Sequence, residues 1–399
     1  MQLRVEPTRL LLIAAQLLLA VAYALPVLRA EQARHSDFLS FYTAWEMVRD
    51  GQGARLYDLD LQSDYQAKAL GLQSSHFALL PFINPPHAAL IFTPIAYLPS
   101  SSAAWLFLTL NCCLATWVLY RLWQLASGWS QAARILLITT TLATEVFWYN
   151  LGTGTMTLLV FACLMEYFLA MRDGRDVSAA VWLIASTIKP QLMVLPAVVP
   201  FAMRRWRLIG VAVSFALIVG LGVSLAFGFH IWRDYLGVLS EVSAHGEKYG
   251  AVPRLMSNLR MILYWTVTPQ AVLPLVCLGL FGGVVISFWL WRSAHDFGVR
   301  FALTILLGVF LAPHLNYQDT IVAILPAALS YDFARTKRVT LVPAFQLLML
   351  TATFLPALLL FTGYSGLLLW IWPLPVVVGL SVICARELSH KHLNAKPHL

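Results

Sequence analysis

One carboxylate in this 399-residue sequence has the surroundings of a general base. Asp37 follows the first long apolar run closely and precedes an aromatic-rich stretch that begins at Phe38 and ends at Trp45. A partly desolvated carboxylate keeps the basicity needed to take a proton from a hydroxyl group. The alternative is structural, because Asp37 or Ser36 could be the N-cap of a helix that starts at Phe38. The two roles are compatible.

A lysine beside a proline interrupts the apolar stretch 177–203. As a single span, this stretch would bury Lys189 and the helix-breaking Pro190 in the middle of the membrane. Two short helices, 178–188 and 190–203, avoid that cost and leave Lys189 at a turn near the outer surface. An ammonium group there can bind an anionic phosphate. A snorkelling lysine that only anchors the turn is the alternative.

The segment APHLNYQD, residues 312–319, concentrates polar groups between two long apolar runs. A plain turn needs one or two polar side chains, and this one has five. His314 could bind a phosphate or help to pass a proton, although a simple cap or surface histidine is the alternative. Asn316 and Gln318 carry amide groups that suit sugar hydroxyls.

Further candidate ligand groups lie in other turns that we place on the same side. Four side chains there could form hydrogen bonds with the sugar or the acceptor, namely Tyr42, Asn84, His87 and Asn150. The loop 229–270 is basic, and its Arg254 and Arg260 could bind a diphosphate. Attraction to anionic lipid headgroups is the simpler explanation of that basic character.

The composition indicates that the elements that hold these residues belong to a membrane protein. Hydrophobic residues make up 59% of the chain, mean hydropathy is +0.73, and apolar runs of bilayer-spanning length recur from end to end. Such runs satisfy their backbone hydrogen bonds only as helices. We therefore predict an all-α polytopic bundle with twelve crossings, near 10–28, 100–120, 133–149, 154–171, 178–188, 190–203, 208–228, 271–291, 299–313, 318–334, 340–361 and 367–384.

The charge distribution predicts the orientation of this bundle. Most of the 27 Lys and Arg residues fall in short segments on one side, which the positive-inside rule makes cytoplasmic together with both termini. Residues 1–399 then form one integral membrane domain with a cytoplasmic tail, 385–399. The large loops 29–99 and 229–270 form the active-site face outside the cytoplasm, with interfacial helices and an aromatic belt. The net charge of +8 orients the chain and does not predict a nucleic-acid partner.

Several segments, in this order and topology, resemble glycosyltransferase family 87 of the polyprenyl-phosphate-dependent GT-C superfold. The matching pieces are SDFLSFYTAWEMVRDGQGARLYD, NPPHAALIFTPIAYLP, YNLGTGTMTLLVF, STIKPQLMVLP and HLNYQD. The resemblance covers residues 1 to about 335. One turn departs from it, since the family pattern reads Asn-Gly-Gln where this chain has Asn150-Leu151-Gly152.

The resemblance implies a hexosyltransferase of the inner or plasma membrane. A sugar, mannose by family association, moves from a polyprenyl phosphate to a hydroxyl of a glycan or glycolipid of the cell envelope. Asp37 takes the place of the family's base, and Lys189 and His314 fall where donor-phosphate contacts are expected, with Arg254 and Arg260 assisting. A single displacement inverts the anomeric centre. Because a lipid phosphate leaves readily and no acidic pair is dedicated to a metal, we expect no metal and no cofactor.

Two other functions stay open from the sequence alone. The first is a polytopic transporter or flippase of lipid-linked sugars, and the second is a non-catalytic scaffold of an envelope-polymer complex. The polar groups gather on one predicted side, whereas transporters more often scatter them through mid-membrane. This sidedness favours an enzyme whose partners are a lipid-linked sugar donor, a glycan or glycolipid acceptor and membrane lipids.

Overall fold

The computed structural model describes residues 7–27, 36–72, 77–249, 256, 258–293 and 296–336, and every regular element in them is helical, which confirms the all-α prediction. The α-helices are α1 (Pro7–Val27), α2 (Asp37–Arg49), α3 (Leu59–Leu70), α4 (Pro86–Phe92), α5 (Ser100–Leu125), α6 (Gln131–Leu142), α7 (Glu145–Thr153), α8 (Thr157–Arg172), α9 (Asp176–Ala185), α10 (Val199–Ala202), α11 (Trp206–Phe227), α12 (Ile231–Ala244), α13 (Leu259–Thr266), α14 (Pro269–Arg292), α15 (Phe297–Leu311) and α16 (Ile324–Thr336). The 3₁₀ helices are η2 (Gly53–Arg55), η4 (Thr93–Tyr97), η5 (Ser186–Ile188), η6 (Pro190–Leu192), η7 (Pro196–Val198), η8 (Gly246–Tyr249) and η10 (Tyr317–Ala323).

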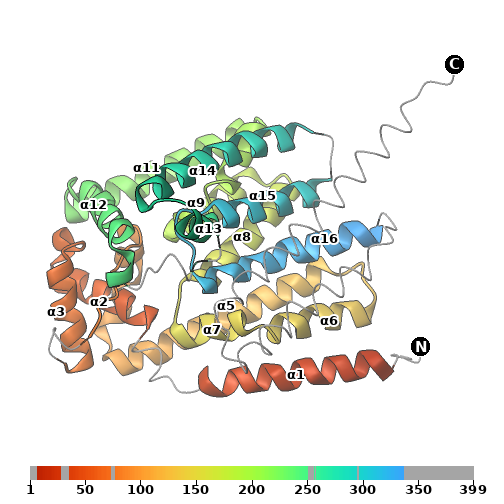
Figure 1. Ribbon diagram of the computed structural model, residues 1–399, viewed down its shortest axis with the longest axis horizontal. Helices are drawn as coiled ribbons and strands as arrows, with labels where there is room; N and C mark the ends of the chain where they lie inside the picture. Colours follow the sequence, from red (N-terminus) through yellow and green to blue (C-terminus); the bar gives the residue numbers. More distant parts are fainter. Residues whose placement is uncertain are drawn as a thin grey trace.

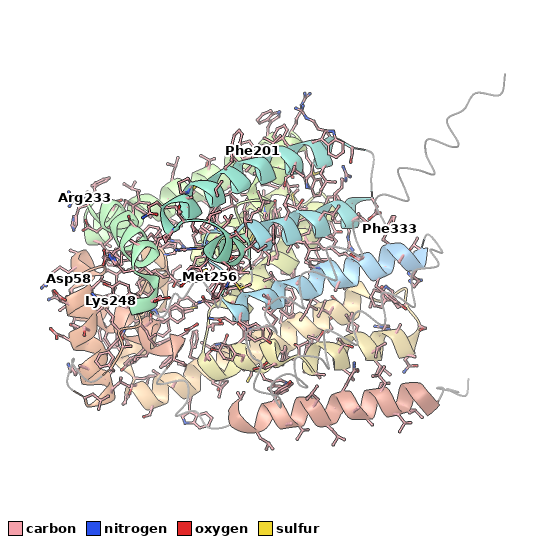
Figure 2. The ribbon with its side chains drawn as sticks, in the orientation of Figure 1. Asp58, Phe201, Arg233, Lys248, Met256 and Phe333 are labelled. Carbon is pink, nitrogen blue, oxygen red and sulfur yellow. The ribbon has the colours of Figure 1, made fainter. Side chains whose placement is uncertain are left out.

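The long helices lie side by side in a bundle, and α2, α3 and α12 gather at one end of it (Figure 1). We call these three helices the end lobe. Helix α1 begins and α16 ends at the opposite end of the bundle. Figure 2 shows charged side chains of the lobe and of the segment after α12, among them Asp58, Arg233 and Lys248, at the lobe end of the molecule.

Three described helices, α5, α11 and α14, are long and apolar enough to cross a membrane. The bent pair α7 and α8 would make a fourth if it counts as one span. Shorter apolar segments are Leu10–Leu25 in α1, Asp176–Ile188 in α9 and η5, and Phe297–Leu311, which is α15. A membrane protein is therefore confirmed, but twelve crossings are not shown. The predicted spans 340–361 and 367–384 and the tail 385–399 lie outside the described residues.

Two predicted spans have the wrong internal structure. The span predicted at 133–149 is divided between α6 and α7, and α7 turns into α8 through an angle of 120°. The predicted helix 190–203 is a succession of 3₁₀ turns and the four-residue α10. Prolines at 190, 196 and 200 explain the second result, because each lacks the N–H that an α-helix interior requires.

The predicted aromatic belt is also wrong for the first loop, because helix α2 is packed inside the protein. Its residues 38–47 are all buried, and Phe38 and Trp45 are 1% and 0% exposed. The ring centroids of Phe38 and Trp45 lie 5.6 and 5.5 Å from that of Phe107 on α5. Aromatic pairs at such distances stabilise the core beyond their buried area. This cluster fixes the start of α2, and with it Asp37, against the bundle.

The bend between α7 and α8 packs closely against the start of α2, and this contact leads to a prediction about stability. Gly154 has φ +65°, and a Cβ atom there would lie 2.8 Å from the Cβ of Phe38. Gly174 has φ +74°, with nothing within 4 Å of such an atom. We expect Gly174→Ala to cost about 1–2 kcal/mol for its left-handed backbone, and Gly154→Ala about 1–3 kcal/mol more for the clash. Thermal unfolding of both variants in one detergent measures this difference. Equal losses would show that α2 does not depend on the close approach.

Candidate active site

A buried ion pair joins two segments that are far apart in the sequence. Lys189 Nζ lies 2.5 Å from Asp319 Oδ1 and donates to Thr157 Oγ1 at 2.8 Å. The Thr157 hydroxyl in turn donates to Asp319 Oδ1 at 2.7 Å. Lys189 is only 7% exposed, and Asp319 is fully buried. The ammonium of Lys189 is therefore buried against a carboxylate, which contradicts the alternative of a snorkelling lysine.

Local backbone structure explains how both charges reach this point. Lys189 lies between η5 and η6 with a non-helical backbone, φ −124° and ψ 78°, so the chain does not continue as a helix through it. Asp319 lies in the first turn of η10, where its Oδ2 accepts the backbone N–H of Asn316 at 3.2 Å in a capping box. One carboxylate thus holds the start of η10 with one oxygen and the lysine with the other.

Asp37 lies beside this pair and does not act as an N-cap. Helix α2 starts at Asp37, no side-chain cap bond is present, and Ser36 Oγ donates instead to the Thr153 carbonyl at 3.0 Å. The Asp37 carboxylate accepts a 2.9 Å hydrogen bond from Gln318 Nε2 and keeps partial exposure. Burial raises the pKa of Asp37, and Lys189, which lowers it, only partly offsets that effect.

Asn150 holds the segment that presents Gln318. Its Nδ2 donates to the backbone carbonyls of Gln318 and Val146 at 2.9 and 2.8 Å, and its Oδ1 accepts from Thr155 at 2.6 Å. Both Asn150 and Gln318 are buried, at 0% and 5% exposure. The structure thus brings these two predicted sugar-binding residues to the site, with their amides engaged within the protein.

His314 lies near the ion pair and near Arg260, since all three charges act on its imidazole. Asn258 donates to the Ala312 carbonyl at 2.7 Å, and Arg260 donates to the Pro313 carbonyl at 3.2 Å, so the start of α13 holds the turn that carries His314. Burial lowers the pKa of His314 to about 4, so the imidazole is neutral near pH 7. The charge of Asp319 raises this pKa and only partly offsets the effect of burial, while Arg260 and Lys189 lower it further.

The remaining predicted ligand residues divide into two groups. Asn84 Nδ2 donates to the Ile188 carbonyl at 2.9 Å, and His87 Nε2 lies 3.4 Å from Thr187 Oγ1, which places both beside the Lys189 break. Tyr42, by contrast, is buried in the core around α2 and donates to the Leu98 carbonyl at 2.9 Å. Arg254 lies outside the described residues.

Two residues that contact Lys189, namely Asp319 and Thr157, were not among the predicted site residues. Asp319 stood out only as one polar group of its turn, and Thr157 was not considered. The alternating threonines of TGTMT, residues 153–157, were an available signal, because hydroxyls in an apolar run seek hydrogen-bond partners when buried.

The burial of the ion pair leads to a prediction about stability. Lys189→Met leaves the Asp319 carboxylate buried without its cation, so we expect the protein to lose about 3–5 kcal/mol of stability. Adding Asp319→Leu removes the stranded charge and should recover part of that loss. Thermal unfolding of the single and double variants in detergent tests this pair. A single variant as stable as the unchanged protein would contradict a buried ion pair.

Comparison with known proteins identifies the family. The family model described as glycosyltransferase family 87 matches residues 82–313, more than half of the chain. No curated protein and no solved structure matches. The matched range includes Lys189, Thr157 and the segment that holds His314 in place, and the apolar helices described above fit an enzyme of the membrane. The chain belongs to glycosyltransferase family 87 and is a membrane glycosyltransferase.

Proposed function

We propose that the protein transfers a hexose, mannose by family association, from a polyprenyl phosphate to a hydroxyl of a glycan or glycolipid, with Asp37 as general base. The observation that carries this proposal is the environment of the Asp37 carboxylate. It is partly exposed, it is held by Gln318, and it stands beside the Lys189–Asp319 pair. A desolvated carboxylate with a raised pKa is a better base than one in water.

The proposed chemistry is a single displacement. The acceptor oxygen attacks the anomeric carbon and forms the new glycosidic bond while its proton passes to Asp37. The bond between the anomeric carbon and the phosphate oxygen breaks, and polyprenyl phosphate leaves with the electron pair. Attack opposite to the leaving group inverts the anomeric centre. Asp37 then returns the proton to water.

The leaving phosphate needs positive charge and hydrogen-bond donors. Within the described part of the chain, Lys189 Nζ donates to two acceptors, which leaves a third N–H for a phosphate oxygen. The Arg260 Nε is buried without a hydrogen-bond partner among the described residues. Neutral His314 can donate one further hydrogen bond. We assign the donor phosphate to these three groups, with Arg254 as a further candidate, because fixed donors stabilise charge as it develops.

The acceptor and sugar contacts fall to the partly exposed members of the predicted set. Asn84, His87 and Asn316 keep partial exposure, and the first two adjoin the residues before Lys189. We place this face outside the cytoplasm. The short basic segments lie on the predicted opposite side, and the positive-inside rule makes that side cytoplasmic.

The first test removes the base. We expect Asp37→Asn to lower kcat/KM for sugar transfer by about 10²- to 10⁴-fold, since an amide cannot take up the acceptor proton. The measurement follows labelled sugar from polyprenyl phosphate to the acceptor. Asp60→Asn, an equal change of charge on the exposed side of α3, serves as the control and should leave the rate unchanged. Full activity of Asp37→Asn would remove Asp37 from its role, and a label that crosses the membrane without leaving its lipid would indicate a flippase.

The second test uses pH. The unprotonated form of Asp37 is the active one, so kcat/KM should fall as the pH drops through its raised pKa. The hydrogen bond from Gln318 lowers this pKa. Gln318→Met should therefore raise the pKa and move the acid limb of the pH profile to higher pH. A limb that stays in place in this variant would show that a different group controls the rate.

A further inference from the structure

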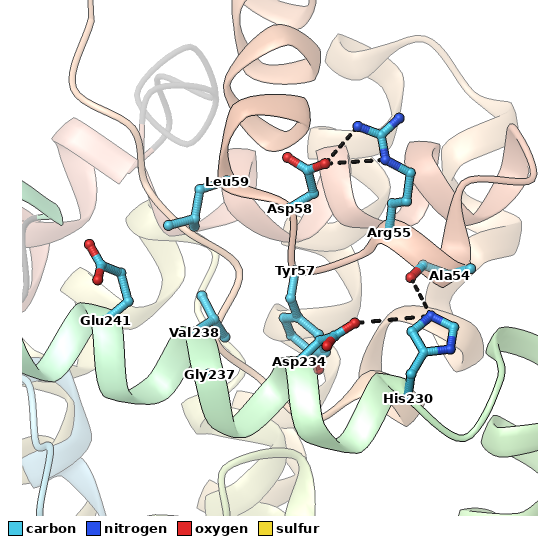
Figure 3. Close-up of a pocket in the computed structure, with 10 residues that line it drawn as sticks. All are labelled: Ala54, Arg55, Tyr57, Asp58, Leu59, His230, Asp234, Gly237, Val238 and Glu241. Carbon is cyan, nitrogen blue, oxygen red and sulfur yellow. Dashed lines mark hydrogen bonds and ion pairs between the residues drawn. The ribbon is translucent and has the colours of Figure 1, made fainter.

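A cleft lies in the end lobe, between η2 with the start of α3 on one side and α12 on the other (Figure 3). Its volume is about 490 Å³, within the range of small-molecule sites. Its walls come only from the two large loops that we predicted to form one face. Leu59 and Val238 contribute apolar surface, and Tyr57, Asp58, Asp234 and Glu241 contribute polar groups.

Three carboxylates and one guanidinium, that of Arg55, line this cleft, so its charge balance disfavours an anionic ligand. Asp58 is paired with Arg55 at 2.6 Å, and Asp234 lies 3.3 Å from Arg233, so these two acids have cationic neighbours. Glu241 accepts from Tyr249 at 3.2 Å and lies 3.1 Å from His245. A second phosphate would meet three carboxylates here. The described acids and histidines also do not converge as a set of three or more metal ligands.

Carboxylates of this kind suit a neutral ligand with many hydroxyl groups. Each ionised carboxylate offers about four acceptor positions, and the contacts above leave several of them for donors from a ligand. The three carboxylates are about one-third to two-fifths exposed, so a ligand can reach them from solvent. Apolar wall atoms between hydrogen-bonding groups complete a surface for sugar rings.

The position of the cleft links it to the transfer site. Helix α2 begins at Asp37 and leads through η2 to the first wall of the cleft, and none of the residues that line the cleft belongs to the site around Asp37. Tyr57, in the cleft wall, donates to the Asn84 carbonyl at 2.7 Å, and Asn84 donates to the carbonyl of Ile188, the residue before Lys189. The two sites are therefore separate but held in one framework.

We propose that this cleft binds the distal sugars of an extended glycan acceptor while the terminal hydroxyl of that acceptor lies at Asp37. This proposal rests on the proposed function above and narrows its acceptor to a linear oligosaccharide or polysaccharide. Because the two sites share no lining residue, a ligand that occupies both must be longer than a single headgroup.

The test compares two acceptors, a simple monosaccharide glycoside and a linear oligosaccharide that ends in the same sugar. With the unchanged full-length protein, we expect a lower KM for the longer acceptor. The double variant Asp234→Asn, Glu241→Gln should raise that KM by about tenfold through its weakened hydrogen bonds, with kcat and the shorter acceptor unaffected. Asp64→Asn, on the exposed surface of α3 outside the cleft, is the matched control.

A binding measurement separates this proposal from the proposed function. Calorimetric titration of the oligosaccharide, without donor, should show binding that the double variant loses and the control keeps. The cleft proposal fails if the unchanged protein does not bind the oligosaccharide. It also fails if the unchanged protein and the double variant show the same preference in KM for the longer acceptor. If sugar is transferred to neither acceptor while the binding difference holds, the proposed reaction fails and the cleft assignment stands. Asp234→Asn alone replaces the double variant if that variant does not fold.

Discussion

The buried pair between Lys189 and Asp319 is the interaction on which the rest of the site depends. Two charges removed from water are tolerated only when they meet each other and their remaining donors and acceptors are satisfied. The hydroxyl of Thr157 and the backbone N–H of Asn316 meet that condition here. These contacts join α8, the break after η5 and the start of η10. Three segments that could otherwise move independently are held at one point.

Asp37, the proposed base, is placed by a second set of contacts that ends at the same turn. The aromatic core around Phe38 and the close approach of Gly154 seat the start of α2. Gln318 then bonds the carboxylate of Asp37, and Asn150 holds the backbone of Gln318. The site thus combines a rigid scaffold with a partly exposed reactive group, as chemistry on a bound hydroxyl requires.

Sequence reasoning succeeds here where the signal is local. The apolar runs of α5, α11 and α14 are long and unbroken, so hydropathy locates them to within a few residues. Asp37 attracts attention in the sequence because a carboxylate that closely follows an apolar run has few neutral explanations, and its catalytic role stays a prediction. The partner of Lys189 was not, because 130 residues separate it from Asp319 and no periodicity connects them. Aromatic residues after the first span suit a lipid interface and a packed core equally well, and only the fold decides between them.

The adjacency of Gln318 and Asp319 has a consequence for how this enzyme can evolve. Gln318 donates to the carboxylate of Asp37, and its neighbour Asp319 compensates the buried lysine, yet both belong to the same turn of η10. An insertion, a deletion or a shift of one residue in this turn would change both properties in a single step. The segment should therefore resist drift as a unit, and changes in substrate preference have more freedom in the end lobe, where side chains can vary without disturbing the turn.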